Sequence, residues 1–370
     1  MKVAIISTFD TFFDRVDLLK EYYQSKDAEV TVITSDYSHR LKEKYRNEKA
    51  DVQIPVREYK KNLSVDRLRS HDEFAKKTKV YLETLLPDII HCIIPCNSLC
   101  QTLSEYKQNH KVQLIFDVND LWPESLPVGN FKYRFPFTLW KNRRDKYIDN
   151  ANIVLSECNY FKEILHKTKD PKWHTLLFAK KVMPLNTHAS LKPDELNFCY
   201  LGSINNIIDI ELIIDFLCAC SNARKVGLHI IGGGEKKELL ISGLKNHAVN
   251  VIDHGYIFDQ DEKQHILDQC NYGLNIMKDT VMVGLTMKSM DYMCGGLPLI
   301  NTIKGDTAKI CDEYQVGYNI NKNNLNDIVS KISLETVEEN QIKREKIKNI
   351  FISKFTQKAF NETLERIGIL

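Results

Sequence analysis

The chain has 370 residues, of which 43% are apolar and 27% are charged, so it is long enough for about two ordinary domains. This composition excludes wholesale disorder, a collagen-like repeat and a small disulfide scaffold. The formal charge is only +2, so no global field draws the chain to nucleic acid. The chain has no apolar run near the ~20 residues of a membrane span, and the run at 3–6 is too short for a signal peptide. We therefore expect a cytoplasmic protein.

The first half of the chain alternates short apolar runs with amphipathic stretches. The apolar runs are continuous, which indicates parallel strands buried on both faces. We predict strands at 2–7, 29–34, 88–93, 112–118, 152–155 and 174–178. Residues 64–86 show helical periodicity that Pro87 ends, which predicts one long helix.

The second half repeats this alternation after a linker. Residues 182–195 hold two prolines among small polar residues and form the best linker in the sequence. We predict strands at 196–201, 227–231, 250–252, 272–277, 297–300 and 316–320, followed by an almost wholly helical stretch at 323–370. The chain is thus predicted to form two α/β halves. Ligands of such folds bind outside the carboxyl ends of the strands, which predicts a site in the cleft between the halves.

The ten cysteines lie mostly inside apolar stretches. In a reducing compartment, free cysteine behaves as a small buried hydrophobic residue. One cluster, Cys92, Cys96 and Cys100 beside His91, invites a metal site but lacks a second ligand pair at zinc-finger spacing. We predict core packing rather than zinc binding.

The segment 284–300 is the most informative for function. A loop leads into a helix that begins near Thr286 and ends at Gly295. The first turn of a helix presents free N–H groups and the positive end of a dipole, so it suits an anion. Lys288 in this turn is unfavourable for the helix alone, which points to a bound anion, and Asp291 on the same face could accept hydrogen bonds from a ribose. A solvated Lys288–Asp291 pair is the alternative.

The same segment carries a family resemblance. Residues 287–300, Met-Lys-Ser-Met-Asp-Tyr-Met-Cys-Gly-Gly-Leu-Pro-Leu-Ile, resemble the Lys-x-x-Glu-Tyr-Met-x-x-Gly-x-Pro-Val-Ile block of retaining GT-B glycosyltransferases, in the group 1 (GT4) family. Further matches follow in the family's order: Cys199-Tyr-Leu-Gly-Ser203, His229-Ile-Ile-Gly-Gly-Gly-Glu235 and His254-Gly-Tyr256. Residues 117–125 resemble the Asp-Leu-Trp-Pro-Glu-Ser of bacterial capsule, exopolysaccharide and O-antigen members. The resemblance spans nearly the whole chain.

This resemblance implies an α/β GT-B architecture of two facing Rossmann-like domains with parallel sheets. It implies an N-terminal acceptor-binding domain at 1–185 and a C-terminal nucleotide-sugar-binding domain at 186–351. A C-terminal helix at about 352–370 is expected to cross back to the first domain.

A donor site also follows from the resemblance. Lys278 and Lys288 are candidates for the basic pair that neutralises charge on the leaving diphosphate. Asp291 takes the family's second acidic position, which holds the ribose. Tyr256 is either a base contact or a packed loop aromatic, and Asn205 stands where many members carry a basic residue. The expected donor-binding residues are Gly202, Ser203, Asn205, Gly233, Tyr256, Thr286, Lys288 and Asp291.

The sequence departs from the family pattern at two positions. Val283 stands eight residues before Asp291, where the family has the acidic residue that contacts the sugar, and Asp279 is a candidate substitute. Ile93 replaces the second histidine of the family's His-x-His-x-Pro, which leaves His91 either as a site residue or as a buried structural histidine. The catalytic candidates are Lys278, Lys288, Asp120 and His91.

Contacts with the acceptor are expected from the first half of the chain, because functional residues concentrate on strand-end loops. Trp122 is alternatively loop packing beside Pro123. Arg67, Arg69 and His71 lie on the long helix, where a solvated basic face is a simpler interpretation than a contact with an acceptor diphosphate. The expected acceptor-side residues are Asn97, Trp122, Glu124 and Arg69.

Two further segments bear on cofactors and partners. Asp259-Gln-Asp261 fits a metal-binding Asp-x-Asp, but Glu262 makes a helix capping box the better interpretation, so we expect no required metal and no cofactor beyond the nucleotide-sugar donor. Residues 131–146 interleave aromatic and basic residues, which suits the headgroup zone of an anionic membrane. An amphipathic helix with an aromatic core face is the alternative. We expect peripheral attachment to the inner face of the cell membrane and no nucleic-acid partner.

The sequence therefore predicts a metal-independent glycosyltransferase. It would move a sugar, with retention, from a UDP- or GDP-linked donor to a lipid-linked glycan acceptor in bacterial surface polysaccharide synthesis. Two alternatives stay open. One is a non-hydrolysing nucleotide-sugar epimerase, and the other is a non-catalytic partner subunit, which Val283 and Ile93 suggest.

Overall fold

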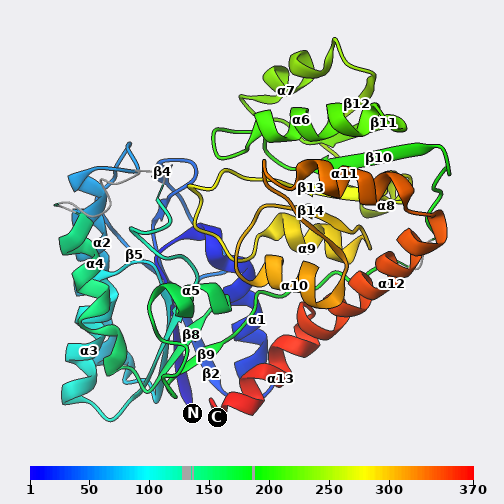
Figure 1. Ribbon diagram of the computed structural model, residues 1–370. Coiled ribbons are helices and arrows are strands. Elements are labelled where there is room, and N and C mark those ends of the chain that lie inside the picture. Colours follow the sequence, from blue (N-terminus) through cyan, green and yellow to red (C-terminus); the bar gives the residue numbers. More distant parts are fainter. Residues whose placement is uncertain (127–134, 136, 186–187) are drawn as a thin grey trace. The chain divides into compact units, whose positions relative to one another are not determined.

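The computed structural model describes residues 1–126, 135, 137–185 and 188–370, and they form two compact units (Figure 1). The first unit is Met1–Ala179 with Phe360–Leu370, and the second is Lys180–Ala359. Each unit contains a parallel sheet with helices, so the predicted α/β fold of two Rossmann-like halves is confirmed. Among the described residues no helix is both long and apolar enough to cross a membrane.

The sheet of the first unit has seven parallel strands in the order β5-β2-β1-β6-β7-β8-β9. Its strands are β1 (Lys2–Ser7), β2 (Glu29–Ser35), β5 (Val52–Ile54), β6 (Ile89–Ile94), β7 (Gln113–Val118), β8 (Ile153–Ser156) and β9 (Trp173–Thr175). A separate antiparallel ribbon pairs β3 (Tyr37–Ser38) with β4 (Glu43–Lys44). The edge strand β5 and the ribbon lie outside the predicted strands, because runs of two or three residues carry too little periodicity to recognise.

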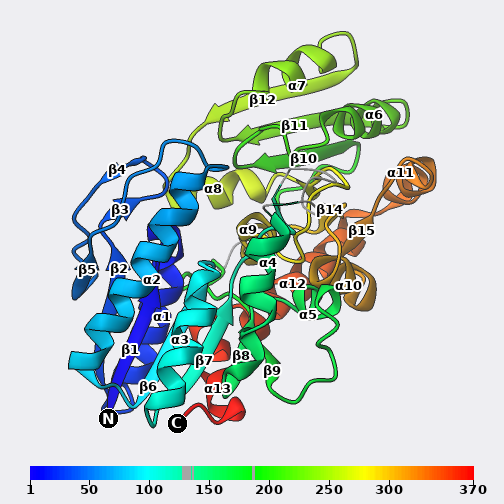
Figure 2. The ribbon, with the colours of Figure 1, turned by 90° about the vertical axis from the view of Figure 1, so that its left-hand side faces the viewer.

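The helices of the first unit are η1 (Asp10–Phe12), α1 (Phe13–Gln24), α2 (Val65–Leu85), α3 (Ser98–Asn109), α4 (Phe137–Asp145), η3 (Ile148–Asn150), α5 (Asn159–Ile164) and α13 (Gln357–Ile367). Figure 2 shows α2 and α3 side by side. The long helix begins and ends as predicted. Ser64 accepts a hydrogen bond from the backbone N–H of Arg67, and Leu86 ends the helix in a left-handed conformation.

The core of the first unit joins both ends of the chain. Leu19 of α1 and Leu364 of α13 are fully buried in the same apolar cluster as Ile5 of the central strand. This packing confirms that the C-terminal helix returns to the first unit. Cys92, Cys96 and Cys100 are also fully buried, as predicted.

The sheet of the second unit has six parallel strands in the order β12-β11-β10-β13-β14-β15. They are β10 (Glu195–Leu201), β11 (Lys225–Ile231), β12 (Val249–Gly255), β13 (Tyr272–Asn275), β14 (Leu299–Asn301) and β15 (Gly317–Asn319). The helices are α6 (Ile210–Ser221), α7 (Lys237–Leu244), α8 (Gln260–Leu267), α9 (Met287–Cys294), α10 (Asp306–Tyr314), α11 (Leu325–Leu334) and α12 (Val337–Lys354).

The unit boundaries differ from the predicted ones by six to eight residues, which matters because Lys180 begins the second unit. The backbone N–H of Lys180 donates to the carbonyl of Phe355 at 2.8 Å. Lys348 of α12 reaches the carbonyl of Leu185 at 3.0 Å. These contacts attach the start of the expected linker to α12, so the second unit begins before residue 186.

Candidate functional site

The second sheet contains a topological switch point. From β10 the chain continues to β11 and β12 on one side, whereas β13, β14 and β15 lie on the other side. The loops that leave the carboxyl ends of β10 and β13 therefore diverge, and ligands of open α/β sheets bind at such a divergence. Gly202 follows β10, and α9 follows the loop after β13.

Close backbone approach shapes the turns at these strand ends. Gly202, Gly232 and Gly234 have positive φ angles of 104°, 130° and 134°. A Cβ on Gly232 would collide with the carbonyl of Gly202, and a Cβ on Gly234 would collide with the backbone of Ile204. Glycine is therefore required here, and the turn after β10 packs directly on the turn after β11.

Lys288 lies in the first turn of α9, beside the turn after β10. Its Nζ donates to the hydroxyl of Tyr200 at 2.8 Å and lies 3.9 Å from the centre of that ring. Its Cε is 3.6 Å from the position that a Cβ on Gly202 would take. Among the described residues Lys288 has no carboxylate partner, and burial lowers its pKa to about 7. The sequence-based pair with Asp291 does not form.

Asp291 instead forms an ion pair with Lys180, with Nζ and Oδ1 2.5 Å apart. Both side chains are mostly buried, with exposed fractions of 16% for Lys180 and 24% for Asp291. Sequence reasoning missed Lys180 because the two residues are 111 positions apart and no local pattern links them. The carboxylate keeps a second oxygen that could accept a hydrogen bond from a ribose hydroxyl.

The start of α9 is held from within the second unit. The Thr286 hydroxyl accepts a hydrogen bond from the backbone N–H of Ser289 at 3.0 Å, so Thr286 is the N-cap. Behind it, buried Asn275 donates to the hydroxyl of Ser289 at 3.0 Å and to Asn301 at 2.8 Å. This amide network, which the sequence did not reveal, fixes the direction in which α9 presents its N–H groups.

The other expected donor residues lie around this point with varied exposure. Ser203 and Lys278 are exposed, whereas the side chain of Asn205 accepts from the backbone N–H of Ile207 at 3.1 Å. Tyr256 is 71% exposed, and its ring stacks on that of Phe258 with 6.4 Å between centres. A Cβ on Gly233 would collide with the hydroxyl of Tyr256, so the tyrosine lies over that glycine.

The position of the family's sugar-contacting acidic residue, here Val283, and its candidate substitute, Asp279, differ in exposure. Val283 is half-buried, and the Asp279 side chain is 90% exposed and 3.6 Å from Lys304. Asp279 is therefore an exposed side chain whose ion-pair partner is Lys304. The string at 259–261 behaves as the capping prediction states, because Asp259 accepts from the backbone N–H of Glu262 at 2.8 Å.

In the first unit, the expectation of a catalytic His91 is corrected. His91 is the third residue of β6 and is fully buried, rather than following the strand end. One ring nitrogen pairs with the Tyr23 hydroxyl at 2.9 Å, and the other lies 3.3 Å from Asp117. Burial alone would raise the pKa of Asp117, but the buried Arg15 and His91 lower it to about 2. His91 therefore belongs to a buried charge network.

The acceptor-side candidates mostly build the loop after β7. Asn97 is fully buried and donates to the carbonyls of Trp122 and Trp140 at 3.0 and 3.1 Å. Glu124 is buried in a two-pronged ion pair with Arg144, with distances of 2.8 and 2.9 Å. Neither side chain is presented to an acceptor, which corrects the prediction for both residues.

The remaining two polar candidates of the first unit differ. Asp120 is half-buried, accepts hydrogen bonds from the Ser125 hydroxyl at 2.5 Å and the backbone N–H of Leu121 at 2.8 Å, and burial raises its pKa. Arg69 is exposed and lies 3.7 Å from Asp66. By contrast, Arg67 and His71 on the same helix are each only 1% exposed, so the interpretation of a solvated basic face is wrong for them.

The basic and aromatic segment at 131–146 is only partly described, because residues 131–134 and 136 lie outside the described residues. In α4, Trp140 is buried at 5% exposure and Arg144 is fully buried. Arg143 pairs with Asp72 at 2.5 Å. Trp140 and Arg144 therefore serve the interior of the first unit, as the alternative of a helix with an aromatic core face predicts for Trp140, and membrane attachment of the segment stays a prediction.

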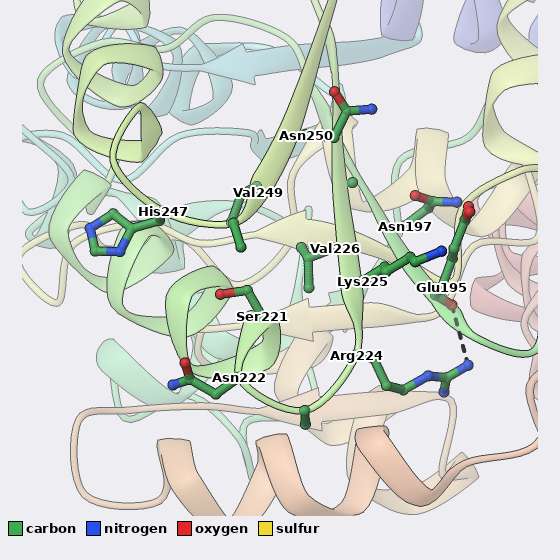
Figure 3. A pocket seen from close by; sticks show the side chains of 13 residues that line it. Glu195, Asn197, Ser221, Asn222, Arg224, Lys225, Val226, His247, Val249 and Asn250 are labelled. Carbon is green, nitrogen blue, oxygen red and sulfur yellow. Dashed lines mark hydrogen bonds between the residues drawn. The ribbon is translucent and has the colours of Figure 1, made fainter.

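A depression of ≈ 680 Å³ lies at the amino ends of three strands of the second sheet, away from the glycine turns (Figure 3). Its lining comes from the beginnings of β10, β11 and β12 and includes Asn197, Lys225 and Asn250. Arg224 donates to the carbonyl of Glu195 at 3.3 Å across its rim. The glycine turns stand at the other ends of these strands, so this depression is separate from the predicted donor site.

No protein-family model and no curated protein sequence matches the chain. Among solved structures, the lipopolysaccharide outer core galactosyltransferase WaaB in its apo form is 15% identical, with a TM-score of 0.68 over 99% of both chains. Sucrose-phosphate synthase from Thermosynechococcus elongatus is 13% identical, with a TM-score of 0.71 over 99% of this chain and 98% of that one. Anabaena Alr3699/HepE in complex with UDP is 13% identical, with a TM-score of 0.69 over the whole of both chains. The chain therefore has the GT-B fold.

Proposed function

We propose that this protein is a glycosyltransferase that uses a nucleotide-diphosphate sugar as donor. The observation that carries the proposal is Lys288, a half-buried cation without a carboxylate partner among the described residues, beside the Gly202 turn at the switch point. An unpaired cation at a helix start and a glycine turn form a site for a diphosphate. The sequence resemblance to group 1 glycosyltransferases and the GT-B fold support the same assignment.

In this proposal the residues of the second unit share the donor. Lys288 and the free N–H groups of α9 bind the diphosphate and offset the charge that grows on it as the sugar leaves. Gly202 lets the backbone approach the phosphates, and Asp291 accepts from the ribose. Tyr256, exposed and stacked on Phe258, offers a surface for the base. Anabaena Alr3699/HepE, of the same fold, was solved with UDP and with UDP-glucose.

For the acceptor we propose a lipid-linked glycan of a bacterial surface polysaccharide, with transfer on the inner face of the membrane. The resemblance of residues 117–125 to capsule and O-antigen enzymes supports this proposal, as does the printed description of WaaG, a glycosyltransferase involved in lipopolysaccharide biosynthesis. We also propose retention of configuration and independence of divalent metal. The capping role of Asp259 supports independence of metal, because it gives the Asp-x-Asp string a structural explanation.

Calorimetric titration with UDP, GDP and their glucose and mannose derivatives tests the donor proposal. We expect one nucleotide to bind, and Lys288→Met to weaken it by about 10- to 100-fold, the loss of a charge-assisted hydrogen bond. Lys192→Met is the matched control, because this side chain is 65% exposed and lies before the amino end of β10, whereas Gly202 follows its carboxyl end. Unchanged binding by Lys288→Met would refute the assigned site.

A non-catalytic partner subunit is the second candidate, and two observations favour it. Val283 occupies the position of the family's sugar-contacting carboxylate, and His91 is enclosed in the core. Release of free nucleotide from a donor sugar in the presence of a bacterial lipid extract distinguishes the two. The glycosyltransferase proposal requires release that Lys288→Met abolishes, whereas a binding subunit gives none with any donor.

A further inference from the structure

A cluster of aromatic and histidine rings around one arginine lies at the carboxyl end of the first sheet. Phe9 follows β1, Trp122 follows β7, and α2 and α4 supply further members. We call it the arginine–aromatic cluster, and its members are Phe9, His39, Tyr59, Arg67, His71, Trp122 and Trp140. Its members bond to one another and to neighbouring backbone, but several of their hydrogen-bonding groups have no partner in the residues that the structure describes.

Arg67 is the centre of this cluster. It is 1% exposed, and its Cζ lies 3.9 Å from the centre of the Trp122 ring and 5.7 Å from that of Trp140. Its Nη1 donates to the carbonyl of Asn62 at 2.8 Å. Its Nε and Nη2 have no hydrogen-bond partner among the described residues. Arg67 forms no ion pair with a carboxylate among the described residues, and none of the undescribed residues is acidic.

The aromatic rings offset the positive charge of Arg67, but they do not accept hydrogen bonds from its unused N–H groups. A ring stacked on a guanidinium offsets the positive charge through its π face. The N–H groups of a guanidinium point outward in its own plane, where a stacked ring cannot accept them. A buried N–H without a partner destabilises the fold, so a second function is needed to explain a buried arginine left in this state.

Two more side chains beside Arg67 also lack partners within the described part of the chain. His71 is 1% exposed, its ring stacks on Trp122 at an interplanar angle of 13°, and neither of its nitrogens is hydrogen-bonded to a described residue. Burial and the nearby charge of Arg67 hold the pKa of His71 well below its ordinary value, so the ring is neutral and keeps one N–H. Trp140 Nε1 is a further donor without a described partner, and the ring centre of Trp140 is 6.0 Å from that of His71.

We propose that the arginine–aromatic cluster is a binding site for an oxyanion, a phosphate or a carboxylate, at the carboxyl end of the first sheet. The unused groups are mainly N–H donors on a fixed cation and on rigid rings, which is the complement of a group that only accepts. The half-exposed His39 and Lys42 connect the cluster to the surface, because His39 pairs with the Tyr59 hydroxyl at 2.7 Å and lies 3.4 Å from Lys42 Nζ.

We assign this oxyanion to the acceptor substrate, and this assignment rests on the proposed function. The acceptor would then carry either a phosphate from a lipid carrier or a carboxylate from an acidic sugar. The half-buried Asp120 also lies near enough to Arg67 for their charges to interact.

The test compares Arg67→Met with the matched control Lys76→Met, which removes the same charge from an exposed position on α2. Both are made in a Lys288→Met background so that the donor site does not contribute. The probes are inorganic pyrophosphate, geranyl diphosphate and glucuronate, followed by calorimetry. We expect the control chain to bind at least one probe and Arg67→Met to bind it at least about tenfold more weakly.

Thermal unfolding without a probe separates a binding role from a structural one. Because Arg67 is buried with unused donors, Arg67→Met is expected to keep or raise the melting temperature, whereas an arginine needed only for the fold would lower it. His71→Phe preserves the stacking on Trp122 and should lose binding as well. Tighter binding of geranyl diphosphate than of glucuronate identifies a lipid phosphate as the source, and the reverse order identifies an acidic sugar.

Two results would overturn the proposal: no probe binds the control chain, or Arg67→Met and His71→Phe bind as the control does. Binding of UDP to Arg67→Met with native Lys288 is measured separately. If UDP binding is intact there while the oxyanion probes fail, the acceptor inference is wrong and the proposed donor function stands.

Discussion

The pH dependence of donor binding follows from the environment of Lys288. Burial lowers the pKa of this lysine to about 7 in the free chain. A diphosphate beside Nζ favours the charged form, so the pKa of Lys288 in the complex rises back towards its ordinary value. Binding therefore takes up a proton at any pH between these two values.

The direction and size of the effect follow from this shift. Both phosphates of UDP-glucose are diesters, whose charge stays constant from about pH 6 to about pH 9. Below about pH 7 Lys288 is already charged, and the affinity is flat. Above it, the affinity falls by about tenfold per pH unit, because each unit costs about 1.4 kcal/mol to protonate the lysine. The loss from about pH 7 to about pH 9 approaches a hundredfold.

Calorimetry at about pH 8, in two buffers of different protonation enthalpy, measures both the affinity and the proton taken up. We expect an uptake of close to one proton, about 0.9 at one unit above the pKa. Lys288→Arg is the informative variant, because arginine stays charged throughout this range and should remove both the uptake and the pH dependence. An affinity that is equal at about pH 6.5 and about pH 9 in the native chain would contradict the assigned role.

Three further predictions address the site and its supports. Gly232→Ala should destabilise the second unit by about 2–4 kcal/mol in urea unfolding, because its φ is 130° and the new Cβ would meet the carbonyl of Gly202. In the control Gly255→Ala the new Cβ has open space, so the loss should be only about 1–2 kcal/mol, and equal losses would show that the close approach of the turns is unimportant. Asp291→Ala should weaken uridine and UDP alike, by about tenfold, because both carry the ribose, while Lys288→Met should weaken only UDP; the same pattern in both variants would refute the division of roles. Asp117→Asn leaves Arg15 buried without its carboxylate and should lower the free energy of unfolding by about 3–5 kcal/mol. The control Glu365→Gln, in the exposed pair with Lys26, should lower it by less than about 1 kcal/mol, and an equally small loss for Asp117→Asn would refute the buried network.

The fold was accessible from sequence because its signals are local. Continuous apolar runs of four to seven residues marked most of the parallel strands, and side-chain caps marked helix starts. Ser64, Asp259 and Thr286 each accept a backbone N–H at the start of a helix. The glycine turns were also recognisable, because each glycine motif directly follows a predicted strand and the motifs occur in the family's order.

The partners of the site residues were not accessible in this way. Asp291 pairs with Lys180 and Lys288 with Tyr200, across separations of 111 and 88 residues. Periodicity places Arg67 and His71 on a helix face, but whether that face is covered depends on loops elsewhere in the chain, here the one that carries Trp122. A family motif identified the position of His91, but its partners Tyr23 and Asp117 lie 68 and 26 residues away in the sequence, so the motif did not show that His91 belongs to a buried network.

A crystal structure of the chain with UDP-glucose tests most directly whether the diphosphate binds at the switch point of the second sheet. We predict a phosphate oxygen about 2.7–2.9 Å from Lys288 Nζ, with the diphosphate against the Gly202 turn. A nucleotide found elsewhere, such as in the depression at the opposite ends of β10 to β12, with Lys288 still bonded only to Tyr200, would contradict that prediction.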